Sequence, residues 1–364
     1  MTYIIIGLTC FIIVAILHTV CTKDIDVTMI GICSLAVIIS FGLTTLFDYK
    51  NQTDDVEIWS GKVIDVEHKE EWNEYHPPKV ETYTTTDSNG KTVTKTRTKA
   101  GYWEHHYAEN HIETTDKGRF SVKRVPDGRK LTDDFVNSDK ELEQYFPIGK
   151  PTSSAHTFEN KLKASYSVFK HKEISLKDYE GLPEYPEDTN DNLTVNRLFG
   201  NFKNKDKVSQ RLDEINTRLN DTDNPKNIDK VKSYKQVNLM LVNFGDKSED
   251  YGYALQDYWK NGAKNDFVVT FGTDSKGKII WTHAFSWTDA EILKTDVREY
   301  IIGTNVKDMI KSVDDVADMI EEKFNRKEFK EFDYIQVEVS TTAKVVMFAM
   351  FVIICLVYCF ADWR

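Results

Sequence analysis

The stretch from residue 48 to residue 344 contains no cysteine, although the chain of 364 residues has five. This absence excludes a disulfide framework, a cysteine metal site and a cysteine nucleophile from the polar part of the chain. A cysteine-free domain is tolerated in any compartment, so the absence does not decide which side of a membrane it faces. The five cysteines lie in or beside the apolar ends of the chain: Cys10, Cys21, Cys33, Cys355 and Cys359.

The sequence also lacks the motifs of the common nucleotide-binding and hydrolytic enzymes. It has no P-loop, no dinucleotide fingerprint and no nucleophile elbow. Internal repeats and low-complexity tracts are missing as well. No catalytic residue is therefore assigned, and enzymatic activity is the less favoured interpretation.

Charge is absent from three long windows, Tyr3–Val20, Val27–Phe47 and Val345–Ala361. Each is long enough for a helix that crosses the hydrocarbon core, which takes roughly 17–25 apolar residues. A signal peptide is the alternative for the first window, but no basic residue precedes Tyr3 and no small-x-small site lies near Val20. The spans carry no buried acid or base of a proton relay, so a transporter is not expected. We predict an integral membrane protein with three spans, 3–20, 27–47 and 345–361.

The short link between the first two spans determines the topology. Six residues, Cys21–Asp26, allow only an antiparallel helix hairpin, which places residues 48–344 on one side of the bilayer. Lys50 and Lys344 flank this region and Lys23 and Arg364 lie opposite, so the positive-inside rule gives two against two and does not fix the side.

The polar region is acidic. Without Lys23 and Arg364 the chain keeps 45 of its 47 bases, and without Asp24, Asp26 and Asp362 it keeps 55 of its 58 acids, which leaves about −10. This balance argues against nucleic acid as a partner and against an electrostatic grip on anionic lipid. The expected partners are the lipid bilayer and an envelope protein, with the oligomeric state open.

Residues 48–130 have the pattern of a small antiparallel β domain. Val56–His68 alternates apolar and polar residues. Two Thr-rich runs, 80–86 and 91–98, flank Asn89-Gly90, a strong hairpin signal because both residues accept positive φ. Trp103–His111 and Gly118–Arg124 are further strand candidates.

The remainder is predicted to comprise a connecting region, 131–230, and an α/β sandwich, 231–340. The connecting region looks helical from 195 to 220, most clearly at about 205–220. The sandwich follows a βαββαα order. Its expected strands are 237–244, 266–271, 278–285 and 334–339, and its expected helices are 251–259, 289–300 (with Asp289 as N-cap) and 313–329. The fold class is thus an α+β membrane protein.

Residues 231–330 resemble the TPM domain of bacterial and plastid membrane-associated proteins. The resemblance rests on the strand Gln236–Val242, on Tyr251–Trp259 followed by Lys260–Asp266, and on the strand Phe267–Phe271. It implies a βαβ-type module tethered to a membrane and favours an extracytoplasmic domain of a bacterial inner-membrane protein. Phosphatase activity attributed to some members suggests a metal-dependent hydrolase, but Ala284–Ala290 departs from the family pattern. The β region also resembles uncharacterised phage and bacterial membrane proteins.

Five of the nine histidines cluster in the β region. Strand alternation over Trp103–His111 would put His105 and His111 on one face and His106 on the other. His105 and His111, with His68 or His76 and with Glu70 or Glu71, could supply the three or four donors of a transition-metal site. The alternative is a set of surface histidines on a polar hairpin, since the spacing matches no zinc signature. A divalent metal is thus an open question rather than an assigned cofactor.

A second candidate set is acidic: Asp250, Asp266, Asp274 and Asp289. Ligands of α/β folds bind near the carboxyl ends of strands, and Asp274 follows such an end. Carboxylates suit calcium or magnesium. The alternative is local: Asp250 and Asp289 would cap helices, and Asp274 would belong to an Asp-Ser-Lys-Gly turn.

Three functions remain open. We favour a membrane-anchored binding or scaffold module at a bacterial or phage-infected cell envelope. The alternatives are a metal-dependent hydrolase of the TPM type and a phage lysis or superinfection-exclusion factor.

Overall fold

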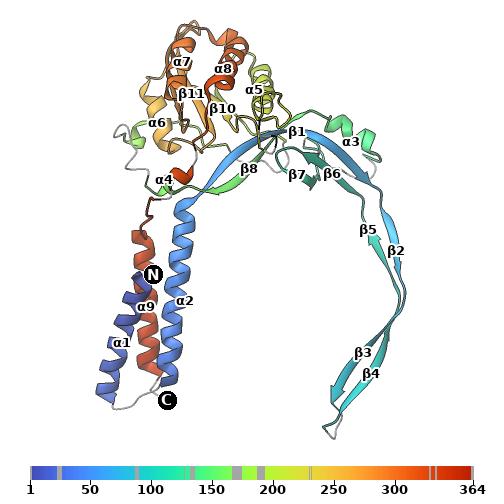
Figure 1. Cartoon of the computed structure of the whole chain (residues 1–364), viewed down its shortest axis with the longest axis vertical. Coiled ribbons are helices and arrows are strands. Elements are labelled where there is room, and N and C mark those ends of the chain that lie inside the picture. Colours follow the sequence, from blue (N-terminus) through green and yellow to red (C-terminus); the bar gives the residue numbers. More distant parts are fainter. Residues whose placement is uncertain are drawn as a thin grey trace.

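The computed structural model describes residues 2–22, 27–86, 90–126, 128–131, 136–165, 174–186, 193–228, 230, 232–327, 329–332 and 334–361. The link 23–26, the turn residues 87–89 and the terminal 362–364, on which expectations were placed, lie outside these ranges. Three helices are long and apolar enough to span a membrane: α1 (Thr2–Thr22), α2 (Val27–Thr53) and α9 (Thr341–Ala361). They lie side by side in Figure 1, as expected for an α+β membrane protein.

The two chain connections between the helices and the polar region are tied together. Helix α2 runs six residues beyond the predicted span and passes directly into strand β1 (Asp54–Lys69). Ser340 precedes α9, and its hydroxyl accepts from the amide of Ala343 and donates to Asp48 Oδ1 at 2.5 Å. The amide of Ser340 donates to Asp48 Oδ2 at 2.9 Å, so this carboxylate on α2 holds the first turn of α9.

A four-stranded antiparallel sheet of order β7-β6-β1-β8 follows the helices. Strand β8 pairs with the first half of β1, from Asp54↔Glu159 to Lys62↔Pro151, and β6 pairs with the second half, from Val63↔Thr114 to Lys69↔Glu109. Helix α3 closes a small core under it, with Val63, Ile112, Leu142 and Phe146. The new elements are β6 (Glu109–Thr114), β7 (Gly118–Ser121), α3 (Asp139–Tyr145), β8 (Pro151–Glu159) and α4 (Lys161–Ala164).

The α/β part, which we call the body, has a mixed sheet of order β12-β11-β10-β9. Strands β9, β10 and β11 are parallel, and β12 is antiparallel to β11. Leu239, Leu241 and Val269 face α5, α7 and α8, whereas Met240 and Val268 face α6. The elements are β9 (Leu198–Gly200), α5 (Lys205–Asn220), β10 (Asn238–Asn243), α6 (Asp250–Tyr258), β11 (Asp266–Thr273), β12 (Ile279–Ser286), α7 (Glu291–Ile301) and α8 (Met309–Lys323), with 3-10 turns at Leu176–Asp178, Val306–Asp308 and Phe329–Phe332.

Buried polar contacts join β1 to the body. The Arg197 guanidinium, 2 % exposed, donates to Ser60 Oγ of β1 at 2.8 Å and to Asp213 Oδ1 of α5 at 3.0 Å. Glu57 of β1 is paired with Lys264 at 3.3 Å and with Arg326 at 2.9 Å. Removing one partner of a buried pair would leave the other charge buried without compensation. These contacts therefore fix the body on strand β1, which continues directly from helix α2.

The structure corrects several boundaries. Trp103–His111 is two strands rather than one, and the break falls at Tyr107-Ala108. The stretch 195–220 begins with strand β9, and β8 completes the β sheet from within the expected connecting region. Residues 334–339 form no strand, and α8 begins and ends earlier than predicted.

Candidate functional site

The most distinctive feature is a long two-stranded arm, residues 70–108, that extends β1 and β6 away from the body (Figure 1). Its inner ladder pairs β2 (Trp72–His76) with β5 (Tyr102–His106), and its outer ladder, the tip ribbon, pairs β3 (Lys79–Thr86) with β4 (Thr92–Lys99). The ladders are separated where Pro77 and Pro78 lack the amide hydrogen that pairing requires.

The tip ribbon has no core. All eight residues of β4 and six of the eight in β3 are exposed. A two-stranded hairpin in water is only marginally stable by itself, because it has no buried face. The ribbon is therefore a surface element, and its free edges present unpaired backbone groups.

The two faces of the tip ribbon differ in chemistry. One face has Val80 opposite Thr98, followed by three Thr–Thr pairs from Thr82↔Thr96 to Thr86↔Thr92. The other face is basic. There Lys99 and Arg97 contact Glu81 at 2.6 and 3.0 Å and hold the pKa of this carboxyl below its usual value. The remaining members of the basic face are Lys79, Tyr83, Thr85, Val93 and Lys95.

The tip ribbon is positive in an acidic protein. Residues 79–99 contain five basic and two acidic side chains, a net charge of +3, against −11 for the whole chain. The rest of the molecule therefore carries −14. The net charge of about −10 for residues 48–344 does not reveal this separation, because it sums the basic ribbon with the acidic remainder.

The four histidines predicted as metal ligands are not gathered into one group within the described ranges. His68 lies on β1 and shares a hydrogen bond of 2.8 Å with Asn110, whereas His111 lies on β6 with its Nε2 3.7 Å from Glu109. His76 and His105 are on the inner ladder, but on opposite faces of it. His106, which the single-strand interpretation had separated from the candidates, shares the face of His76.

The four aspartates also do not converge in the part of the chain that the structure describes. Asp250 is the first residue of α6, after the N-cap Glu249. Asp274 Oδ1 accepts from the amides of Lys276 and Lys278 at 2.8 Å, as a turn residue does.

Asp289 is not the N-cap of α7, because that position is taken by Ala290. Its carboxylate pairs with Lys327 at 3.2 Å instead.

Asp266 is fully buried at the start of β11. Its carboxylate accepts from the amide of Ala263 at 2.7 Å, from Tyr185 Oη at 2.8 Å and from Asn238 Nδ2 at 2.9 Å. Burial raises its pKa to about 7 against these three bonds, which lower it. The group closes the loop before β11 and ties the segment around Tyr185 to the sheet.

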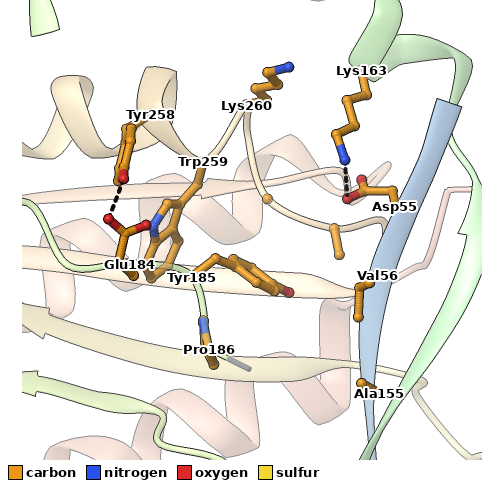
Figure 2. Close-up of a pocket in the computed structure, with 12 residues that line it drawn as sticks. Asp55, Val56, Ala155, Lys163, Glu184, Tyr185, Pro186, Tyr258, Trp259 and Lys260 are labelled. Carbon is orange, nitrogen blue, oxygen red and sulfur yellow. Dashed lines mark hydrogen bonds and ion pairs between the residues drawn. The ribbon is translucent and has the colours of Figure 1, made fainter. Parts of the chain in front are cut away.

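A cavity of about 490 Å³ lies beside this network, between β1 and the end of α6 (Figure 2). Tyr258 Oη donates to Glu184 at 2.6 Å and Lys163 donates to Asp55 at 3.4 Å, so four of its polar groups form two pairs, one at each end of the cavity (Figure 2). Tyr185 and Trp259 form much of its apolar wall. Among the described residues that line it, neither of the two polar pairs joins a nucleophile to a base.

Comparison with protein-family models, curated proteins and solved structures found no match to this chain.

Proposed function

We propose that the protein is a membrane-anchored binding module in which the arm contacts an acidic protein partner at a bacterial envelope, on the extracytoplasmic side. The observation that carries this proposal is the tip ribbon, an ordered pair of strands with no core of its own. Surface that is not needed for the fold and has a distinct charge is typical of an interaction site.

The charge and the free edges favour a protein as the partner. The +3 ribbon in a −11 chain selects an anionic surface. A free strand edge, in addition, can pair with a strand of another protein through main-chain hydrogen bonds. Lipid headgroups would use the charge but not the edges.

A relationship of the body to TPM domains remains part of this proposal. It is supported by the order β10-α6-β11 and by the tether that leads on to α9. Because the described aspartates are apart, no observation favours the metal-dependent hydrolase as a second function.

The test is site-specific crosslinking in the host cell. Tyr83, on the basic face, is replaced by the photo-crosslinker p-benzoylphenylalanine in the full chain, and Thr84, on the opposite face, is the matched position. We expect a discrete protein adduct from position 83. We expect it to weaken at least about fivefold in Lys79→Glu/Lys95→Glu, since charge complementarity mainly governs encounter.

The control variant Lys276→Glu/Lys307→Glu makes the same change of charge on exposed residues of the body and should leave the adduct intact. If only lipid adducts formed, the tip ribbon would bind the membrane surface, and the proposal of a protein partner would be overturned. No adduct at either position, with the chain present in the membrane, would overturn the proposal.

A further inference from the structure

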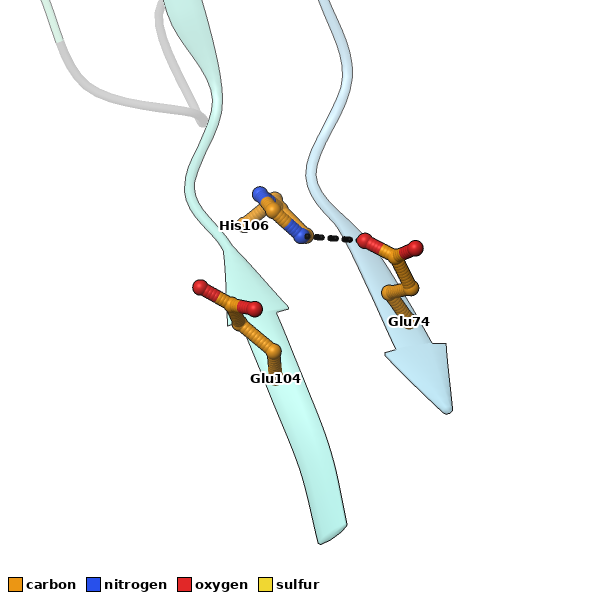
Figure 3. Close-up of side chains that lie close together, drawn as sticks. All are labelled: Glu74, Glu104 and His106. Atoms are coloured by element: carbon orange, nitrogen blue, oxygen red, sulfur yellow. Dashed lines mark hydrogen bonds and ion pairs between the residues drawn. The ribbon is translucent and has the colours of Figure 1, made fainter. Parts of the chain in front are cut away.

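One face of the inner ladder has a near-symmetric order of side chains. Trp72 lies opposite His106, Glu74 lies opposite Glu104, and His76 lies opposite Tyr102. Two imidazoles therefore flank a central pair of carboxylates. Figure 3 shows Glu74, Glu104 and His106 converging from the two strands.

Three of the donor atoms are gathered closely enough to share one metal ion, and a fourth lies beside them. His106 Nε2 is 3.2 Å from Glu74 Oε2, and His76 Nε2 is 2.8 Å from Glu104 Oε2 and 3.7 Å from Glu74 Oε2. Ligands held at roughly 2.0–2.1 Å in a tetrahedron are about 3.3 Å apart. These three distances bracket that value. The donors of Glu74, Glu104 and His106 all lie within 4.8 Å of one another, whereas His76 lies outside that group and contacts only its two carboxylates.

Both imidazoles are oriented by aromatic neighbours. His106 stacks on Trp72 with centroids 4.3 Å apart, and His76 stacks on Tyr102 at 4.7 Å. On the other face, Tyr75 and Trp103 pack at 5.0 Å and fix the register of the strands. The four donor side chains are about one third to one half exposed, so an ion has an open path to them.

The central carboxylates are suited to a bound cation. Like charges directly opposite each other destabilise a strand pair, and no Lys or Arg is paired with Glu74 or Glu104 among the ion pairs of the described residues. A divalent metal supplies positive charge between the two carboxylates and takes imidazole nitrogens as further ligands.

We propose that the inner ladder of the arm binds one transition-metal dication, with zinc as the ion that best suits a set of two imidazoles and two carboxylates. The four ligands are His76, His106, Glu74 and Glu104. The ion joins strands β2 and β5 and stiffens the arm between the body and the tip ribbon. This site does not depend on a partner at the tip.

The experiment uses the full chain in neutral-lipid nanodiscs, stripped of metal with EDTA and returned to buffer without chelator. Zinc is titrated by calorimetry, and cobalt binding is followed by its visible absorption, which is intense only in a tetrahedral field. We expect one ion per chain. The affinity should fall at least about 100-fold in His76→Gln/His106→Gln, because these residues supply half of the donors.

The matched control is His105→Gln, which removes a histidine from the opposite face of the same strand and should leave the affinity unchanged. A second readout is hydrogen exchange: zinc should slow exchange of the β2 and β5 amides in the unaltered chain and not in the double variant. Absence of one-to-one binding, or equal loss in His105→Gln and the double variant, would overturn the proposal.

Discussion

The Asp266 carboxyl in the body has a pKa of about 7, so its neutral and ionised forms are nearly equal in free energy at neutral pH. Three hydrogen bonds favour the carboxylate, while complete burial favours the neutral acid and is the larger effect. A folded-state pKa of about 7, against 3.8 without these surroundings, means that the folded protein binds this proton more tightly than the unfolded chain. The stability from protonation is therefore complete below about pH 4 and is lost as the pH rises through about 7.

We predict that the body melts at a lower temperature at pH 8 than at pH 5. The part of the linkage that falls between pH 5 and pH 8 is about 3 kcal/mol, or roughly 8 °C in melting temperature, most of it lost between pH 5 and pH 7. Asp266→Asn should remove most of this slope, and Asp274→Asn, in an exposed turn, should not. Thermal unfolding of the full chain in detergent, followed by circular dichroism, measures it. An unchanged slope in Asp266→Asn would contradict the assignment.

The sequence predicted that Asp266 begins a strand, but it did not predict which residues surround its side chain. Tyr185 comes from 81 positions earlier in the chain and Asn238 from 28 positions earlier. Both contacts depend on tertiary packing, which local propensity does not encode. The metal-ligand prediction for the four aspartates rested on their positions near the ends of strands and helices. Aspartates also occur at such positions as ordinary turn residues and at helix starts, so position alone does not distinguish a metal ligand.

Among the elements, strand β9 depends on one glycine. Gly200 has φ of +97°, and a Cβ there would lie 2.0 Å from the carbonyl oxygen of Asn243, its partner in the parallel pair with β10. We expect Gly200→Ala to destabilise the body by about 3 kcal/mol or more, because the strain of positive φ adds to a clash with rigid backbone.

The matched substitution Gly149→Ala separates the two causes. Gly149 has φ of +84° with nothing within 4 Å of an added Cβ, so it keeps only the strain, about 1 kcal/mol. The melting temperatures of the two variants distinguish the two causes. If both variants lost a similar amount of stability, the backbone at Asn243 would move away from the added Cβ at no cost in free energy.

The sequence predicted the hairpin but not its register, and the shared face of His76 and His106 depends on that register. Residues paired in the tip ribbon have numbers that add to 178, as in Lys79↔Lys99, and the same holds for His76↔Tyr102 and for Val66↔Ile112. The same sum relates β3 to β4, β2 to β5 and the outer part of β1 to β6. A two-residue Asn89-Gly90 turn would instead give pairs that add to 179, which would place Glu74 opposite His105. The pairing of Glu74 with Glu104 therefore depends on a register one residue away from the one that the Asn-Gly signal predicts.

At the scale of the whole molecule, the apolar windows predicted the three helices, while the direct passage of α2 into β1 was not foreseen. Polar residues at the end of α2 lie beyond any hydrophobic window, yet the helix continues to Thr53. The contacts of Arg197 and Glu57 then fix the body to β1. The body and helix α2 are thus joined without a flexible linker in between.

The position of the tip ribbon matters for how the protein can be placed in a bilayer. In Figure 1 its tip ribbon turns back to the level of the three helices. A ribbon of Thr, Lys and Arg with open edges cannot enter hydrocarbon, where every unpaired backbone group costs several kcal/mol. If the helices are inserted, we expect the arm to bend away from the bilayer at its unpaired positions, Glu70-Glu71 with Tyr107-Ala108 or Pro77-Pro78.

We predict that Thr84→Cys, in a variant whose native cysteines are replaced by serine, reacts with a membrane-impermeant maleimide in liposomes as fast as Ser275→Cys on the body. Both residues are exposed. Leu356→Cys, within α9, should stay protected at least about tenfold, because thiols in hydrocarbon are rarely ionised. Protection of Thr84→Cys comparable to that of Leu356→Cys would mean that the ribbon lies in the bilayer, which would require its edges to be covered. The same reagent applied to intact cells reports the side that residues 48–344 occupy, because it labels the arm only if the arm lies outside.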